Sequence, residues 1–253
     1  MDIILYNITI AIACLIFGYL IGSFPTSVVI GKVFFHQDPR NYGSHNAGGT
    51  NAGRLWGKKV GLVIVIIDMI KTIAPLWICW AVLTHSGLES WVINEEIVIK
   101  DAPLYYYLAA LGTAIGHCWP IYVNFKGGKA ASNYMGICCG SSWILFCSCI
   151  VYFIFLKMKK YVSLASILSA IINTFVAWGI LGLAYLLKNN GMNDINAFGF
   201  GLWGWGYCLS LGTLGGWEFP TIITLMGIIV LIRHRSNIER LKAGSETKIK
   251  WMK

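Results

Sequence analysis

Charged residues are scarce in this chain, and acidic residues are the scarcest. Only 12% of the 253 residues are charged, with 11 Asp and Glu against 20 Lys and Arg, whereas charge makes up about a quarter of an ordinary soluble chain. Long segments lack charge altogether and exceed the roughly 20 residues with which a helix crosses a membrane. These uncharged segments are 3–31, 102–125, 130–156, 161–187 and 195–217. With 57% hydrophobic residues, the sequence excludes a soluble domain and predicts an all-α, polytopic membrane protein.

Several chemical signatures are missing as well. No basic residue precedes the first apolar segment, only Asp2, and the segment is too long for a cleaved signal peptide. Most of the eight cysteines lie in apolar runs, without the spacing of metal ligands. The sequence also shows no Ser-His-Asp triad, no Walker motif and no carboxylate-rich metal motif. We therefore expect no metal and no cofactor, and we interpret the thiols as small buried side chains.

The charges between the apolar segments are asymmetric. Loop 32–59 has five basic residues and one acidic residue, tail 233–253 has seven and two, and loop 85–101 has one and four. Because basic loops stay on the cytoplasmic side, we expect the N-terminus and loop 85–101 outside, and loop 32–59 and the C-terminus inside. This asymmetry accounts for the net charge of +9 better than binding of nucleic acid does.

The order of the apolar segments predicts one membrane-embedded domain over residues 1–253 with about seven transmembrane helices. After the first segment, the expected helices cover 60–84, 102–121, 131–156 and 161–187, with two more in 195–232, broken near Gly215–Gly216. One feature opposes this count, because Lys157, Lys159 and Lys160 then fall on an outer turn. The alternative is that segment 130–156 is re-entrant and returns to the cytoplasmic side.

The first of three glycine-rich polar segments is Gly43–Arg54, which reads GSHNAGGTNAGR. Its glycines let a ligand approach the backbone, and its serine, threonine and asparagine side chains are short hydrogen-bonding groups. Arg54 can hold a phosphate with its planar fork. The alternative is an ordinary connecting loop, but a simple turn does not need so many donors around one arginine.

The second polar segment, 116–133, has two glycines between two lysines, directly before a long apolar segment. The backbone N–H groups of Gly127 and Gly128, with the helix N-terminus that follows, can form a phosphate cradle beside Lys126 and Lys129. Lysines at a membrane boundary are also common topology anchors. This segment alone therefore does not decide between a site and an anchor.

The third polar segment, Arg233–Ile249, contains His234 and Asn237, which share a face if the last helix continues. His234 titrates near neutral pH and can accept a hydroxyl proton. The alternative is a basic tail that is attracted to anionic lipid.

One pair of charges lies inside an apolar helix. Asp68 and Lys71 are three residues apart, so they lie on the same face of that helix. Because an unpaired charge in lipid is costly, we expect these residues to pair with each other or with another helix.

In this order and spacing, the three segments resemble the bacterial PlsY family of acyl-phosphate:glycerol-3-phosphate acyltransferases, over nearly the whole chain. The first family motif is matched by Ser44, Asn46, Gly48, Thr50, Asn51 and Arg54. The second is matched by Gly116, His117, Pro120 and Lys126–Lys129. The third is matched by His234, Asn237, Ile238, Arg240, Leu241, Gly244 and Glu246. The departures from the family pattern are His45, Gly49, Trp119 and Ala130–Asn133.

The resemblance implies transfer of a fatty acyl group from acyl phosphate to the 1-hydroxyl of sn-glycerol 3-phosphate, the first acylation of phospholipid biosynthesis. The products are lysophosphatidate and phosphate. Acyl phosphate is an activated mixed anhydride, so the reaction requires no acyl-enzyme, coenzyme A or metal. The resemblance also implies a multi-pass protein of the bacterial cytoplasmic membrane, with its active site facing the cytoplasm and the fatty tail between its helices.

The resemblance assigns roles to residues of the three segments and to Asp68 and Lys71. The expected catalytic residues are Ser44, His234 and Asn237. The expected substrate and phosphate ligands are Arg54, Asn46, Thr50, Asn51, Lys126, Gly127, Gly128 and Lys129. The expected structural supports are Asp68, Lys71, His117 and Glu246. Either His234 or the phosphate of the donor takes the hydroxyl proton.

Two other classes of protein stay open. A transporter for a phosphorylated solute also uses glycine breaks and basic residues, although these motifs fall at the membrane boundary and the sequence shows no inverted repeat. A different membrane enzyme of lipid metabolism, such as a phosphatase or an alcohol phosphotransferase, is the second alternative.

Overall fold

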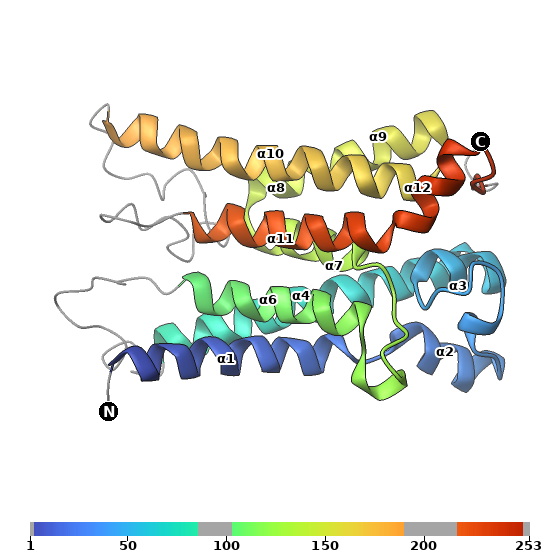
Figure 1. Ribbon diagram of the computed structural model, residues 1–253, viewed down its shortest axis with the longest axis horizontal. Helices are drawn as coiled ribbons and strands as arrows, with labels where there is room; N and C mark the ends of the chain where they lie inside the picture. Colours follow the sequence, from blue (N-terminus) through green and yellow to red (C-terminus); the bar gives the residue numbers. More distant parts are fainter. Residues whose placement is uncertain (1–2, 86–102, 190–216, 250–253) are drawn as a thin grey trace.

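The computed structural model describes residues 3–85, 103–189 and 217–249, which form a bundle of helices without a strand (Figure 1). This confirms the predicted all-α fold. Three of the described helices are long and apolar enough to cross a membrane, or up to four if a bent pair counts as one span. Most of loop 85–101 and the break near Gly215–Gly216 lie outside the described residues, so the crossings expected from those parts of the sequence stay predictions.

The first apolar segment forms two helices, where the sequence suggested one over 3–31. α1 (Ile3–Gly22) ends shortly before Pro25, and α2 (Thr26–Phe35) begins directly after it. Proline has no N–H to donate and disfavours a helical residue before it. The chain therefore breaks at Pro25 and starts a new helix.

α6 (Pro103–Cys118) packs closely along α1 through a row of glycines. A Cβ atom added to any of four glycines would lie 1.9–2.2 Å from a carbonyl oxygen of the other helix, and these are Gly18, Gly22, Gly112 and Gly116. Small residues permit such close approach between helices in a membrane. The contact fixes the C-terminal end of α6, where the second polar segment begins.

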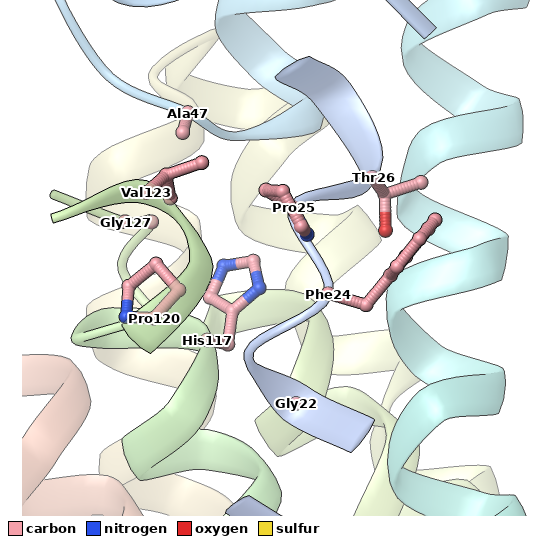
Figure 2. Close-up of a pocket in the computed structure, with 10 residues that line it drawn as sticks. Gly22, Phe24, Pro25, Thr26, Ala47, His117, Pro120, Val123 and Gly127 are labelled. Atoms are coloured by element: carbon pink, nitrogen blue, oxygen red, sulfur yellow. The ribbon is translucent and has the colours of Figure 1, made fainter. Parts of the chain in front are cut away.

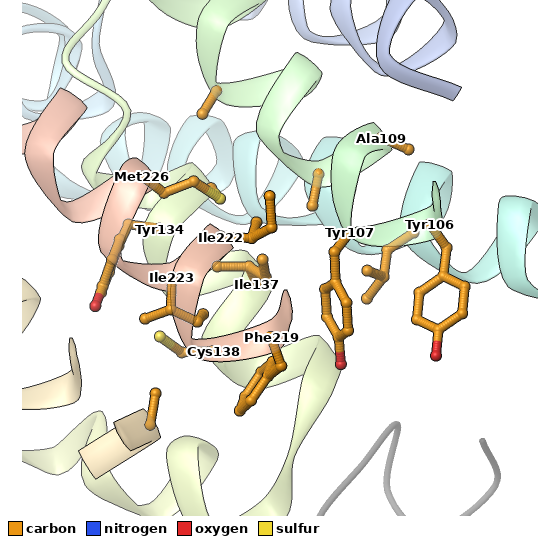
Figure 3. Close-up of a cluster of buried hydrophobic side chains, with 14 of the residues drawn as sticks. Tyr106, Tyr107, Ala109, Tyr134, Ile137, Cys138, Phe219, Ile222, Ile223 and Met226 are labelled. Carbon is orange, nitrogen blue, oxygen red and sulfur yellow. The ribbon is translucent and has the colours of Figure 1, made fainter. Parts of the chain in front are cut away.

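α4 (Lys58–His85) and α11 (Glu218–Arg233) also pack against α6. A core of buried aromatic and aliphatic side chains joins α6 to α11 (Figure 3), and the ring centroids of Tyr107 and Phe219 are 5.3 Å apart. Both of these rings are completely buried. The core thus holds together the helices that lead into the second and third polar segments.

Segment 131–156 is not one transmembrane helix, and the prediction of a single crossing is wrong. It forms three short helices, α7 (Ala131–Ser141), α8 (Trp143–Ser148) and α9 (Ile150–Lys159). Figure 1 shows α9 returning to the end of the bundle at which α7 begins. Contacts to the C-terminal segment agree, because Lys129 before α7 bonds Asn237, and the carbonyl of Lys160 after α9 accepts the N–H of Ile249 at 2.9 Å.

This re-entrant course, which the sequence offered as the alternative, removes the charge conflict, since Lys157, Lys159 and Lys160 at the C-terminal end of α9 lie at the same end of the bundle as the other basic segments. The hairpin breaks at Ser142, whose backbone is extended and whose hydroxyl accepts the N–H of Ile144 at 3.2 Å. Asn173 of α10 (Val162–Asn189) is completely buried and accepts the Ser148 hydroxyl at 2.9 Å. Irregular backbone is tolerated at membrane depth where protein buries it in this way.

The short elements gather at the same end of the bundle, opposite the N-terminus (Figure 1). They are η1 (Pro39–Asn41), α3 (Gly49–Trp56), η2 (Ile121–Val123) and α12 (Arg235–Lys242). α12 bends away from α11 by 56° at His234. This polar end of the bundle contains all three glycine-rich segments.

Candidate active site at the polar end

The three polar segments meet in the structure. Lys129 of the second segment donates a hydrogen bond to Oδ1 of Asn237 in the third. Arg54 of the first segment donates to the carbonyl oxygen of Thr247 at 3.3 Å. Residues that are 75 or more positions apart in sequence therefore form one site.

Lys129 lies among other cations. Its pKa is lowered to about 8, chiefly by burial. The charges of Arg240, Arg54 and Arg233 lower this pKa further, whereas a nearby carboxylate, Glu246, raises it. We call Arg54, Lys129, Arg233 and Arg240 the cationic cluster. The cluster has four cations, whereas one carboxylate, Glu246, acts on Lys129, so part of the positive charge is not compensated.

Glu246 holds the third segment in place. Its Oε1 accepts Nδ2 of Asn237 and the hydroxyl of Ser163, both at 2.8 Å. Its Oε2 accepts Nε of Arg240 at 2.7 Å. Burial raises the pKa of Glu246, but these hydrogen bonds outweigh burial and lower it. Because the amide group of Asn237 donates to Glu246, its oxygen is oriented toward Lys129.

His234 is buried at the bend between α11 and α12, with 4% of its surface exposed. Its Nδ1 lies 2.8 Å from the carbonyl oxygen of Val230, which assigns the proton to Nδ1 and leaves Nε2 as an acceptor. Burial lowers the pKa of His234 to about 4, and the charge of Lys129 contributes to this shift. The ring is therefore neutral at neutral pH. Because the helix bends, His234 and Asn237 do not share the face of one continuous helix.

The glycine turn at Gly127–Gly128 is built against His117. The N–H of Gly128 donates to the carbonyl of His117 at 2.9 Å. A Cβ atom on Gly128 would lie 2.0 Å from Nε2 of His117, and one on Gly127 would lie 2.1 Å from the His117 carbonyl oxygen. Close packing therefore requires both glycines. The N–H of Gly128 is used within the protein, which differs from the phosphate-binding role expected for it.

Asp68 and Lys71 form the buried ion pair that the sequence predicted, with Nζ and Oδ1 at 2.8 Å. The Thr26 hydroxyl donates to the same oxygen at 2.8 Å, and Lys71 also donates to the carbonyl of Phe24 at 2.7 Å. Nδ1 of His117 lies 3.9 Å from Asp68. The pair thus joins the start of α2 to α4 and α6, next to the glycine turn.

A small pocket opens beside His117, between the start of α2 and the glycine turn (Figure 2). Figure 2 shows the imidazole between Pro25 on one side and Pro120 and Val123 on the other. Of the described residues that line this pocket, His117 is the one with a titratable side chain. The positive charge at this end of the bundle therefore lies in the cationic cluster and not in this pocket.

Asn51 organises the first segment. It is 2% exposed, and its Oδ1 accepts the N–H of Ser44 at 3.0 Å. Its Nδ2 donates to the carbonyls of Pro39, Tyr42 and Asn46 at 2.8–3.1 Å. The amide is fully used inside the loop, which differs from the substrate-binding role expected from the sequence.

The other expected ligands lie at the same end with more exposure. Ser44, Arg54 and Lys126 are exposed, and Asn46 and Thr50 are partly exposed. Among the described residues, Arg54 is the one of these five whose side chain bonds the third segment. The structure therefore brings Arg54, but not Lys126, to Lys129.

Arg233 was not among the site residues expected from the sequence. It is the last residue of α11, and its Nε donates to the carbonyl of Gly128 at 3.1 Å. The sequence feature that could have identified Arg233 is its position directly before His234 in the third segment. Its partners are backbone carbonyls, which no sequence pattern identifies.

The fold and the site together define a helical membrane protein with a cluster of cationic side chains at one end of its bundle. The sequence profile of the family described as "Glycerol-3-phosphate acyltransferase" matches residues 12–244. The chain belongs to this glycerol-3-phosphate acyltransferase family, which confirms the resemblance seen in the sequence.

Individual relatives agree over nearly the full length. The glycerol-3-phosphate acyltransferases of Staphylococcus aureus strains bovine RF122 / ET3-1 and Newman are each 34% identical over 248 residues, covering 95% of this chain and 98% of the relative. The crystal structure of PlsY, an integral membrane glycerol 3-phosphate acyltransferase, in its glycerol 3-phosphate form has a TM-score of 0.65 at 27% identity. Its lysophosphatidic acid form has a TM-score of 0.64 at 25% identity. Both comparisons cover 94% of this chain and 95% of the solved chain.

Proposed function

We propose that this protein transfers a fatty acyl group from acyl phosphate to the 1-hydroxyl of sn-glycerol 3-phosphate and releases lysophosphatidate and phosphate. The observation that carries the proposal is the cationic cluster, with the oriented amide of Asn237 beside Lys129. Both substrates bear phosphate groups, and the positive charge of the cationic cluster is only partly compensated by Glu246. The solved relatives are described as glycerol 3-phosphate and lysophosphatidic acid forms, which correspond to the acceptor and product proposed for this chain.

The reaction is one substitution at a carbonyl carbon. The hydroxyl oxygen of glycerol 3-phosphate attacks the acyl carbon, the bond from that carbon to the phosphate oxygen breaks, and phosphate leaves with the electron pair. The donor is already activated, so the protein contributes positioning and charge stabilisation. Arg54 and Lys129 of the cationic cluster bind the phosphates, and the positive charge of the whole cluster lowers the charge repulsion between the two substrates.

His234 orients the attacking hydroxyl. Its Nδ1–H is held by the carbonyl of Val230, so Nε2 accepts the hydroxyl proton as a hydrogen bond. With a pKa of about 4, the imidazole is a weaker proton acceptor than a phosphate group, whose second pKa is about 6. The departing phosphate therefore takes the proton.

The polar end faces the cytoplasm in this proposal. Loop 32–59, the turn at 157–160 and tail 233–249 all belong to this end and are rich in Lys and Arg. The positive-inside rule places such segments in the cytoplasm. Acyl phosphate then enters with its tail between the helices and its phosphate at the cationic cluster.

The test is an assay of the purified protein in lipid nanodiscs with long-chain acyl phosphate and radiolabelled glycerol 3-phosphate. We expect labelled lysophosphatidate and one phosphate released per turnover, and little product when acyl-coenzyme A replaces acyl phosphate. Equal rates with the two donors, or no product with acyl phosphate, would overturn the proposal. Uptake of labelled glycerol 3-phosphate into proteoliposomes without lysophosphatidate formation would favour the transporter alternative.

A further inference from the structure

The side chain of Arg233 forms a bracket between the end of α11 and the glycine turn. Its Nε donates to the carbonyl of Gly128 at 3.1 Å, and Nη2 donates to the carbonyl of Gly127 at 3.5 Å. The guanidinium carbon lies 5.3 Å from the ring centroid of Trp119. One arginine thus bonds two successive carbonyls while an indole ring covers its face.

The glycine turn is held from its other side by α6. The N–H of Gly128 donates to the carbonyl of His117, and the imidazole of His117 fills the space that a side chain at Gly128 would need. The turn is therefore fixed between His117 and Arg233. Neither glycine carries a side chain that could anchor the turn in another way.

This bracket lies directly next to the residues proposed to bind substrate. Gly128 precedes Lys129, and Arg233 precedes His234. Lys129 and Asn237 are in hydrogen-bond contact, so a shift of the turn relative to α11 would separate them. The Arg233 bracket therefore joins the second and third polar segments. In each segment, the residue in the bracket is followed directly by a residue whose polar side chain belongs to the site.

We propose that Arg233 is a positioning residue: with Trp119 it locks the glycine turn to α11 and so sets the distance between Lys129 and Asn237. This inference rests on the proposed function, because its readout is the use of glycerol 3-phosphate.

Arginine and tryptophan each suit this task. A planar guanidinium reaches two carbonyls and stacks on a ring at the same time, whereas a lysine ammonium is a point charge that does not span both carbonyls. Tryptophan is the aromatic residue that attracts a cation most strongly.

The first test compares Arg233→Gln with Arg235→Gln, which makes the same change two residues away on a side chain that is 87% exposed. We expect Arg233→Gln to raise the KM for glycerol 3-phosphate about tenfold, with loss of two carbonyl bonds. Arg235→Gln should leave KM within about twofold, and Arg233→Lys should recover part of the loss. Equal KM values for Arg233→Gln and Arg235→Gln would overturn the inference.

The second test leaves every charge in place. Trp119→Leu removes the ring that covers the guanidinium, so it should also raise the KM for glycerol 3-phosphate, by about threefold to tenfold, while Trp119→Phe should raise it less. If Arg233→Gln is impaired and Trp119→Leu is not, Arg233 acts as a direct phosphate ligand and the positioning role is wrong. A wild-type protein without acyltransferase activity would instead contradict the proposed function. Failure of the proposed function and failure of the positioning role of Arg233 therefore give different results.

Discussion

Two lysine-bearing turns lie at the same end of the bundle and differ in their surroundings. Lys129 is partly buried, bonds Asn237 and has other cations close enough to lower its pKa. Lys157 and Lys159, at the end of α9, are exposed. Positive charge at a membrane boundary is by itself a topology signal. We propose that it becomes a binding site where the charge is partly desolvated, crowded by like charges and held by a polar partner.

The largest expected effect comes from the partner of Lys129. Asn237→Ala removes the hydrogen bonds to both Lys129 and Glu246, each of which is a bond to a charged group and contributes about 1.5–3 kcal/mol. We expect kcat/KM for glycerol 3-phosphate to fall by about a hundredfold or more. Asn41→Ala, at an exposed position of η1, is the matched control. Near-normal kinetics for Asn237→Ala would remove this residue from the site.

A second change tests the turn that carries Lys129. Gly128→Ala places a Cβ atom 2.0 Å from Nε2 of His117, so the turn or the imidazole must shift. We expect a loss of activity of about tenfold to a hundredfold, because misplacing substrate-binding groups by about 1 Å has costs of this order. Gly179→Ala in α10, where a Cβ atom meets nothing within 4 Å, should be neutral. Equal activity of the two variants would show that the turn tolerates movement.

A smaller effect follows from pH. The pKa of Lys129 is lowered from 10.5 to about 8, so in the substrate-free protein this residue loses its charge as pH rises through about 8. The KM for glycerol 3-phosphate should therefore increase above about pH 8. Lys129→Arg keeps its charge at higher pH, so it should flatten this rise even if its turnover is lower. An unchanged pH profile for Lys129→Arg would mean that another group titrates.

The helices whose ends are marked by charge were predictable from the sequence. α4 (Lys58–His85) and α10 (Val162–Asn189) lie within about two residues of the expected ranges. The hairpin in segment 131–156 was offered only as the alternative, from the position of Lys157, Lys159 and Lys160, because the segment itself is as apolar as a spanning helix. What breaks it is Ser142 with the buried support of Asn173, which comes from another helix.

The site, like the fold, has features that the sequence predicts and features that only the structure shows. Sequence patterns identified the three segments, the pairing of Asp68 with Lys71 and the bracing of the tail by Glu246. They did not reveal which groups are used inside the protein. The amide of Asn51 is consumed by its own loop, and Arg233 is recruited by backbone carbonyls. Both facts depend on three-dimensional packing, which residue type and spacing do not encode.

The most direct measurement compares Lys129→Ala with the double variant Lys157→Ala/Lys159→Ala in nanodiscs of the same lipid composition, with kcat/KM for glycerol 3-phosphate as the readout. The double variant removes twice as much charge, but from exposed positions where charge is well screened. We predict that Lys129→Ala lowers kcat/KM by about a hundredfold, whereas the double variant stays within about threefold of wild type. A double variant as impaired as Lys129→Ala would mean that overall positive charge, and not the cationic cluster, is what the reaction uses.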